Sequence, residues 1–262
     1  MKKQSYIYPN NIFEAIVVVV LFLFFSGVLI FINLVFGNLI NIYIMGGLSM
    51  LIGVFVTKRI IEKWHSQRIE LNFKFTKDTI FYKILFLLVF LIIGLITPLL
   101  KIISSYNGVL LNPLNDFYYL LGGLLIAPFV EEILFRRIIL SGLLTKYNYK
   151  VAIFITSLLF ALMHFTSLSH VFTAFMFGVF SGYLYFRTSN LLSVIFLHFF
   201  NNLIRTICNY FHYKYGASQV HSISDIYGKY SVYIISISLM LFVFLLFKRT
   251  GKYLVSREES KI

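Results

Sequence analysis

The sequence contains one cysteine, Cys208, in 262 residues. A single thiol excludes a disulfide within the chain and any metal site that needs several cysteines. Charged residues are also scarce, at 13% of the chain, whereas soluble proteins carry about 25%. Because 59% of the residues are hydrophobic, this shortage of charge excludes an ordinary soluble domain.

Long apolar runs take the place of the missing charges. Runs of about 20 residues recur, which is the length at which a helix crosses roughly 30 Å of hydrocarbon. They predict an all-α fold, a polytopic membrane helical bundle of about eight transmembrane helices, with residues 1–262 as a single integral-membrane domain. The predicted spans are 12–36, 39–57, 84–104, 117–144, 149–165, 171–187, 191–208 and 230–247.

The charge that is present is mostly basic, with a formal net charge of +13. If the N-terminus is cytoplasmic, most of the 23 lysines and arginines lie on the cytoplasmic side of the predicted spans, as the positive-inside rule requires. The bias therefore predicts that both termini are cytoplasmic. It also indicates that the basic residues contact membrane lipid headgroups, and no nucleic-acid partner is expected.

Two of the ten acidic residues are adjacent, Glu131 and Glu132, inside the fourth predicted span. A charge at the centre of a bilayer costs roughly 2.5–3.5 kcal/mol, so such acids are rare and usually functional. Glu132 and Arg136 are four residues apart and can pair on one helix face. Glu131 points about 100° away round the helix. The spacing predicts a structural ion pair between Glu132 and Arg136, with Glu131 as a free carboxylate.

Further polar groups lie on the fifth and seventh predicted spans: His164 on the fifth, and His198 and Asn202 one helical turn apart on the seventh. Glu131 and His164 are both roughly 21–22 Å from the turn that joins their helices, at about 1.5 Å per residue. They are therefore expected to face each other. Phe160 shares a helix face with His164 and is expected to shield the site from water.

Two chemistries suit these groups. A glutamate beside a histidine can deprotonate a water molecule, while a second histidine and an asparagine donate hydrogen bonds to the resulting oxyanion. Alternatively, Glu131, His164 and His198 bind a zinc ion that keeps one position open for water. Both chemistries hydrolyse an acyl bond.

Three segments resemble the signature motifs of the CAAX-protease and bacteriocin-processing family, also called CPBP or Abi. The segments are Glu131-Glu132-x-x-x-Arg136, Phe160-x-x-x-His164 and His198-x-x-x-Asn202. They occur in the family's order within residues 115–208, which are expected to form the motif-bearing catalytic core.

The resemblance also implies roles. Glu131 and His164 would activate the water, His198 and Asn202 would form the oxyanion site, and Glu132, Arg136 and Phe160 would shape the pocket. It favours a metal-independent glutamic protease with no cofactor, and leaves a zinc metalloprotease as the alternative.

The resemblance further implies an intramembrane endopeptidase that acts on membrane-associated peptides or proteins. Eukaryotic members of the family remove the last three residues of prenylated CAAX proteins, whereas many bacterial members process bacteriocins or signalling peptides. The abundance of Ile, Phe, Asn and Lys is typical of an AT-rich bacterial genome. We therefore expect a multi-pass protein of the bacterial plasma membrane that acts in peptide processing, bacteriocin immunity or signalling-peptide maturation.

Two other functions fit the same polar groups. Intramembrane acids and histidines form proton relays in proton-coupled transporters, but the sequence shows no inverted repeat of broken helices. The other alternative is a catalytically inactive membrane scaffold of the same fold. The sequence argues against it, because no residue of the three motifs is missing.

Overall fold

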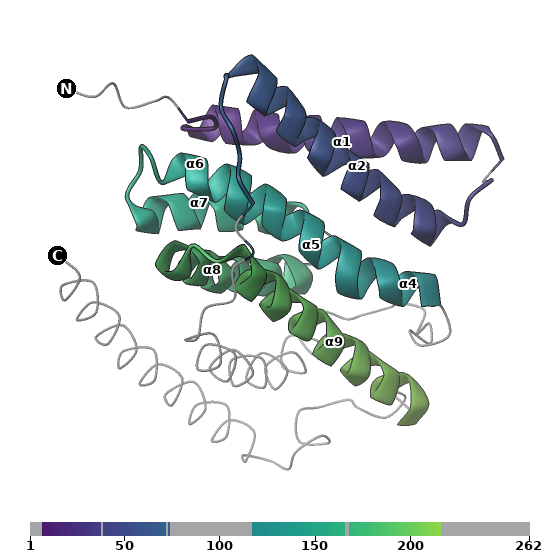
Figure 1. Cartoon of the computed structure of the whole chain (residues 1–262). Coiled ribbons are helices and arrows are strands. Elements are labelled where there is room, and N and C mark those ends of the chain that lie inside the picture. Colours follow the sequence, from purple (N-terminus) through teal and green to yellow (C-terminus); the bar gives the residue numbers. More distant parts are fainter. Residues whose placement is uncertain (1–6, 38, 72, 74–116, 166–167, 216–262) are drawn as a thin grey trace, which may run out of the picture. The chain divides into compact units, whose positions relative to one another are not determined.

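The computed structural model describes residues 7–37, 39–71, 73, 117–165 and 168–215 (Figure 1). All regular secondary structure in these ranges is helical, which confirms the all-α class. The chain divides into two compact units, one formed by residues 1–75 and 113–203, the other by 76–112 and 204–262. The site and the helices described below lie in the first unit, except for residues 204–215, which belong to the second. The predicted spans 84–104 and 230–247 lie outside the described residues.

The first two predicted spans are helices α1 (Ile12–Val35) and α2 (Ile42–Trp64), which pack against each other. Each begins at an asparagine whose side chain accepts a hydrogen bond from the first turn: Asn11 from the N–H of Glu14 and Asn41 from that of Tyr43. Such caps satisfy donors that have no partner within the helix. By length and composition, α1 and α2 are the two described helices that could each cross a membrane.

The fourth predicted span is one continuous helical run from Phe117 to Leu143, with two π-helical stretches. π-helical turns are rare and occur frequently at functional sites. Here they flank the short α-helix that ends with Glu131 and Glu132. In order, the run consists of α4 (Phe117–Leu121), η1 (Gly122–Ile126), α5 (Ala127–Glu132), η2 (Ile133–Leu140) and α6 (Ser141–Leu143).

The next three predicted spans are also helices, namely α7 (Tyr149–Leu162), α8 (Leu168–Thr188) and α9 (Leu191–Tyr215). Glycine lets α7 and α8 approach closely, because a Cβ atom on Gly178 would lie 3.0 Å from the Cα of Ser157. Small residues permit such backbone approach between helices in membranes. This contact fixes α7, and His164 lies in the turn just after the C-terminal end of that helix.

Replacing Gly178 with leucine should therefore destabilise the protein by about 1–3 kcal/mol, because the added side chain meets backbone rather than a flexible neighbour. Thermal unfolding in detergent measures the change. Gly27→Leu is the matched control, since a Cβ at Gly27 meets nothing within 4 Å. Equal melting temperatures for the two variants would contradict the assigned contact.

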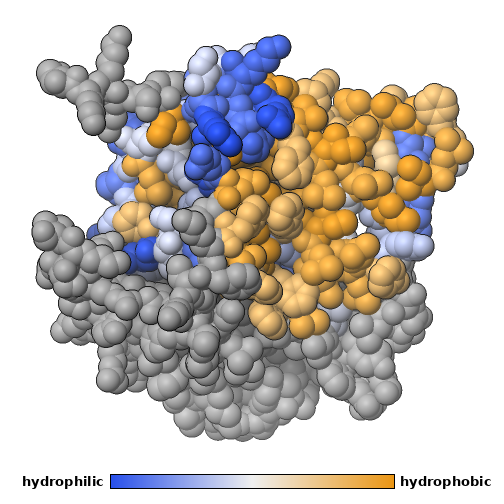
Figure 2. All heavy atoms as spheres, viewed as in Figure 1, coloured by the Kyte–Doolittle hydropathy of each residue, from blue (hydrophilic) through white to orange (hydrophobic). Residues whose placement is uncertain are grey.

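Large apolar side chains are exposed along α1, α2 and α4, among them Phe13, Phe24 and Phe31 on α1. Figure 2 shows apolar surface over much of this face, with the largest polar cluster at the top of the view and smaller polar areas at the left and right edges. Contiguous apolar surface of this extent indicates a partner such as the bilayer. The apolar helices thus mark a membrane protein, while the count of eight spans and the orientation of the termini stay predictions.

Candidate active site

The polar residues of the three motifs meet at one place. They come from the end of α5, the start of η2, the turn that follows α7, and α9. The Oε2 atom of Glu131 lies 3.6 Å from Nε2 of His164 and 3.8 Å from Nε2 of His198. The Glu131 side chain is 14% exposed, and its Oε2 is buried without a hydrogen-bond partner. Glu131 therefore faces two imidazoles at distances too long for direct hydrogen bonds.

The predicted ion pair between Glu132 and Arg136 is present, with Oε2 3.0 Å from Nε and both side chains fully buried. The N–H does not point at the oxygen, so the two groups attract as charges without a hydrogen bond between these atoms. Arg136 also donates from Nη2 to the hydroxyl of Ser181 on α8. The pair thus links the motif run to α8 in the interior.

Glu132 has a second partner that the sequence did not reveal. Its Oε1 lies 2.8 Å from Nδ1 of His198 in a buried hydrogen bond. A carboxylate at one ring nitrogen fixes the ring's orientation and leaves the other nitrogen facing outward. His198 accordingly bridges the two glutamates, with Nδ1 at Glu132 and Nε2 toward Glu131.

His164 lies in the turn after α7 and is oriented by a residue of that helix. Its Nδ1 lies 2.8 Å from the backbone carbonyl oxygen of Phe160, one turn earlier. Nδ1 can only donate in this contact, because a carbonyl oxygen is an acceptor. Nε2 of His164 is thereby left to face Glu131.

Phe160 is buried and lies among the polar groups. Its ring centroid lies 4.4 Å from that of His164 and 5.9 Å from that of His198, and the Arg136 guanidinium lies 5.0 Å from it. Phe177 on α8 covers His198 from another side, with ring centroids 4.6 Å apart. These rings line the polar cluster with apolar surface. Phe177 carries no sequence signal, because it is one of 30 phenylalanines in the chain.

Asn202 lies one turn beyond His198 on α9. Its side-chain amide donates a 2.9 Å hydrogen bond to the carbonyl oxygen of Gly123 in η1. The amide therefore holds α9 against the motif run and has a second N–H remaining. Another imidazole also approaches the site: the ring of His170 on α8 meets that of His164 edge-on, with centroids 5.4 Å apart. His170 belongs to none of the three motifs.

Carboxylate and imidazole groups are ligands that zinc accepts. Within the described ranges, however, no three His, Cys, Asp or Glu side chains are grouped so that they could hold a metal ion. The zinc site predicted at Glu131, His164 and His198 stays a prediction.

Residues 113–204 match the model of the family described as type II CAAX prenyl endopeptidase Rce1-like. The matched segment contains all three motifs and nearly coincides with the predicted core of residues 115–208. The resemblance to the CAAX-protease family is thus confirmed over this segment, and that family is a family of proteases. Comparisons with curated proteins and with solved structures find no match.

Proposed function

We propose that this chain, with its Rce1-like segment at residues 113–204, is an intramembrane endopeptidase that hydrolyses peptide bonds of membrane-associated peptides or proteins. One observation carries the proposal. A buried carboxylate oxygen of Glu131 faces the Nε2 atoms of both His164 and His198 at 3.6 and 3.8 Å. These separations are too long for direct hydrogen bonds, so the carboxylate and the imidazoles keep hydrogen-bonding capacity that a water molecule bound beside them can use.

In the proposed reaction, Glu131 and His164 hold a water molecule and Glu131 takes its proton. The hydroxide oxygen adds to the carbonyl carbon of the peptide bond and gives a tetrahedral oxyanion. When this intermediate collapses, the C–N bond breaks and the proton passes from Glu131 to the departing amine. General-base catalysis of this kind typically contributes about 10²–10⁴-fold to the rate.

The oxyanion needs N–H donors that are already in position. We assign this role to the second N–H of the Asn202 amide and to Nε2 of His198, which is a donor when the ring carries a proton on both nitrogens, since Nδ1 already donates to Glu132. Their partners support the assignment, because Glu132 fixes the His198 ring and the Gly123 carbonyl fixes the Asn202 amide. Donors held in place in this way stabilise developing charge without reorganising during the reaction.

The substrate reaches this site in or beside the bilayer. Exposed apolar side chains lie along α1, α2 and α4, so a membrane-associated peptide can approach along that surface. The proposed localisation is the bacterial plasma membrane, which the protein spans several times. Its proposed role is peptide processing, in bacteriocin immunity or in signalling-peptide maturation.

The proposal is tested by reconstituting the purified full chain in liposomes with panels of lipidated, bacteriocin-like and signalling peptides, and identifying products by mass spectrometry. Cleavage at defined bonds supports it. A proton-coupled transporter would instead acidify the vesicles without cutting any peptide, and an inactive scaffold would do neither.

Removing metal should leave the cleavage rate unchanged within about twofold, because in the proposed mechanism Glu131 itself takes the proton of the attacking water. The measurement compares protein treated with a strong chelator and untreated protein, with the metal content of both samples determined by elemental analysis. If activity disappears with the metal and returns with added zinc, the reaction runs through zinc held by Glu131, His164 and His198.

A further inference from the structure

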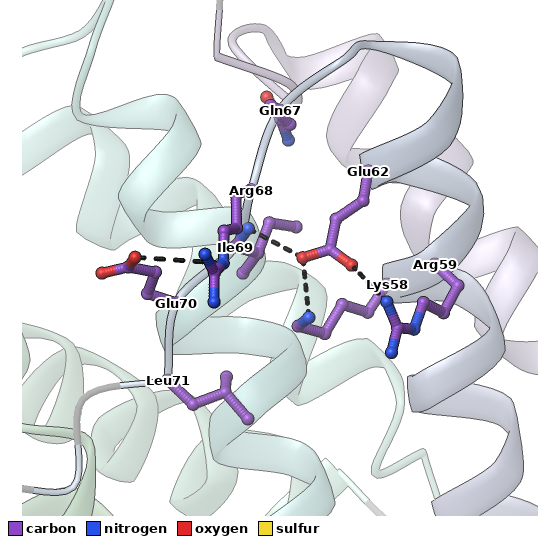
Figure 3. Close-up of a pocket in the computed structure, with 8 residues that line it drawn as sticks. All are labelled: Lys58, Arg59, Glu62, Gln67, Arg68, Ile69, Glu70 and Leu71. Atoms are coloured by element: carbon purple, nitrogen blue, oxygen red, sulfur yellow. Dashed lines mark hydrogen bonds and ion pairs between the residues drawn. The ribbon is translucent and has the colours of Figure 1, made fainter.

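A polar pocket of about 700 Å³ lies where α2 ends and the chain turns back over residues 65–71 (Figure 3). It contains none of the proposed catalytic residues. Three basic and two acidic side chains line it, so its formal charge is +1. The lining residues are Lys58, Arg59, Glu62, Gln67, Arg68, Ile69, Glu70 and Leu71.

One acidic side chain in the pocket is already engaged. Glu62 accepts a hydrogen bond from Nζ of Lys58 at 2.7 Å and another from the backbone N–H of Ile69 at 2.9 Å, both through Oε1. Lys58 and Glu62 are both largely buried. Their charges therefore offset each other, and together they hold the segment after α2 against the helix.

The two arginines are engaged far more weakly. Arg59 lies 3.8 Å from Glu62 and is 83% exposed, while Arg68 lies 4.0 Å from Glu70 and is 87% exposed. Exposed ion pairs at such distances contribute little. The guanidinium groups therefore remain able to bind another anion. The planar fork of arginine suits phosphate in particular, because it donates two parallel hydrogen bonds.

The pocket adjoins apolar surface. On α2, Leu48, Ile52 and Phe55 are exposed on the turns before the pocket, and Trp64 is exposed at the end of the helix. Figure 2 shows the polar surface in direct contact with the apolar surface. A ligand that combines a phosphate group with hydrocarbon chains matches both, whereas free phosphate matches the pocket alone.

We propose that this pocket binds the headgroup of an anionic phospholipid. Arg59 and Arg68 contact the phosphate, and the acyl chains lie along the exposed apolar side chains of α2. The basic residues here belong to the predicted cytoplasmic side, where anionic lipids attract basic side chains.

The same segment touches the motif run. The backbone carbonyl of Glu70 accepts a hydrogen bond from Nε of Arg137, and the ring of Phe73 stacks on that of Phe129, with centroids 6.1 Å apart. Phe129 is two residues before Glu131. A bound headgroup therefore stabilises a segment that packs on the helix carrying the proposed base.

The test is a titration of the purified full chain with phosphatidylglycerol or phosphatidylcholine in detergent, followed by native mass spectrometry. The Arg59→Gln and Arg68→Gln double variant should bind phosphatidylglycerol about tenfold more weakly than the wild type, since each basic residue near a headgroup adds to the attraction. Phosphatidylcholine binding should not change. Both arginines are exposed, so the melting temperature should stay the same.

Lys146→Gln with Lys150→Gln is the matched control, because it removes the same charge from exposed positions outside the pocket. It should change binding by less than about twofold if attraction to anionic lipid is local. An equal loss in both double variants would show general electrostatic attraction and overturn the proposal. Displacement of the lipid by equimolar inorganic phosphate would overturn the assignment to a lipid.

Discussion

Glu131→Gln should abolish peptide cleavage, with kcat/KM falling by about 10²–10⁴-fold, because an amide cannot take a proton from water. The substitution keeps the size and shape of the side chain. It should also leave the fold intact, since Oε2 of Glu131 makes no hydrogen bond in the folded protein. The measurements are the cleavage rate in proteoliposomes and the melting temperature in detergent.

Lys150→Gln is the control for this prediction, because it neutralises an exposed charge that lies outside both the proposed site and the polar pocket. Its cleavage rate should match the wild type. His164→Ala should lose activity as Glu131→Gln does, and combining the two should cost little more than either alone, since residues that act as a unit are not additive. Unchanged cleavage in both single variants would refute the assigned chemistry.

The relative positions of Glu131 and His164 followed from the sequence. Equal distances from the turn between their helices placed them at one level, and the structure brings them to 3.6 Å. The i, i+4 spacing likewise predicted the contact between Glu132 and Arg136, which is 3.0 Å long. Both predictions depend on local helix geometry, which spacing determines.

The bond between Glu132 and His198 could not be predicted, because it joins residues 66 positions apart. It depends on how α9 is rotated against the motif run, and packing sets that rotation. The π-helical stretches on both sides of α5 were not predicted either. Predictions from residue spacing assume a regular α-helix, so they do not reveal where the backbone hydrogen bonds change to the wider π-helical pattern.

Helix α2 continues beyond the end of the predicted second span, and the reason is definable. The span was predicted to end at residue 57, where the first basic residues begin, and the helix itself continues to Trp64. The charged residues do not end the helix, because Lys58 and Glu62 pair at i, i+4 spacing and stabilise its last turns. Polarity indicates where a helix leaves the apolar region, but not where it ends.

Glu132→Leu should destabilise the protein strongly, by about 3–5 kcal/mol, because it leaves the Arg136 charge buried without its carboxylate. Arg136 is fully buried, and its other polar contact is with the Ser181 hydroxyl. Chemical denaturation or thermal unfolding in detergent measures the loss. Cleavage should fall as well, because unfolding and loss of the His198 contact both lower it.

The double variant Glu132→Leu with Arg136→Met separates stability from catalysis. Replacing a buried ion pair with apolar residues of similar volume is often neutral or stabilising, so the double variant should recover most of the lost stability. Its cleavage rate should stay below that of the wild type, because no carboxylate remains at Nδ1 of His198 to fix the ring. Recovery of both stability and activity would show that Glu132 serves only the ion pair. Recovery of stability alone makes Glu132 a positioning residue that acts on the peptide through His198.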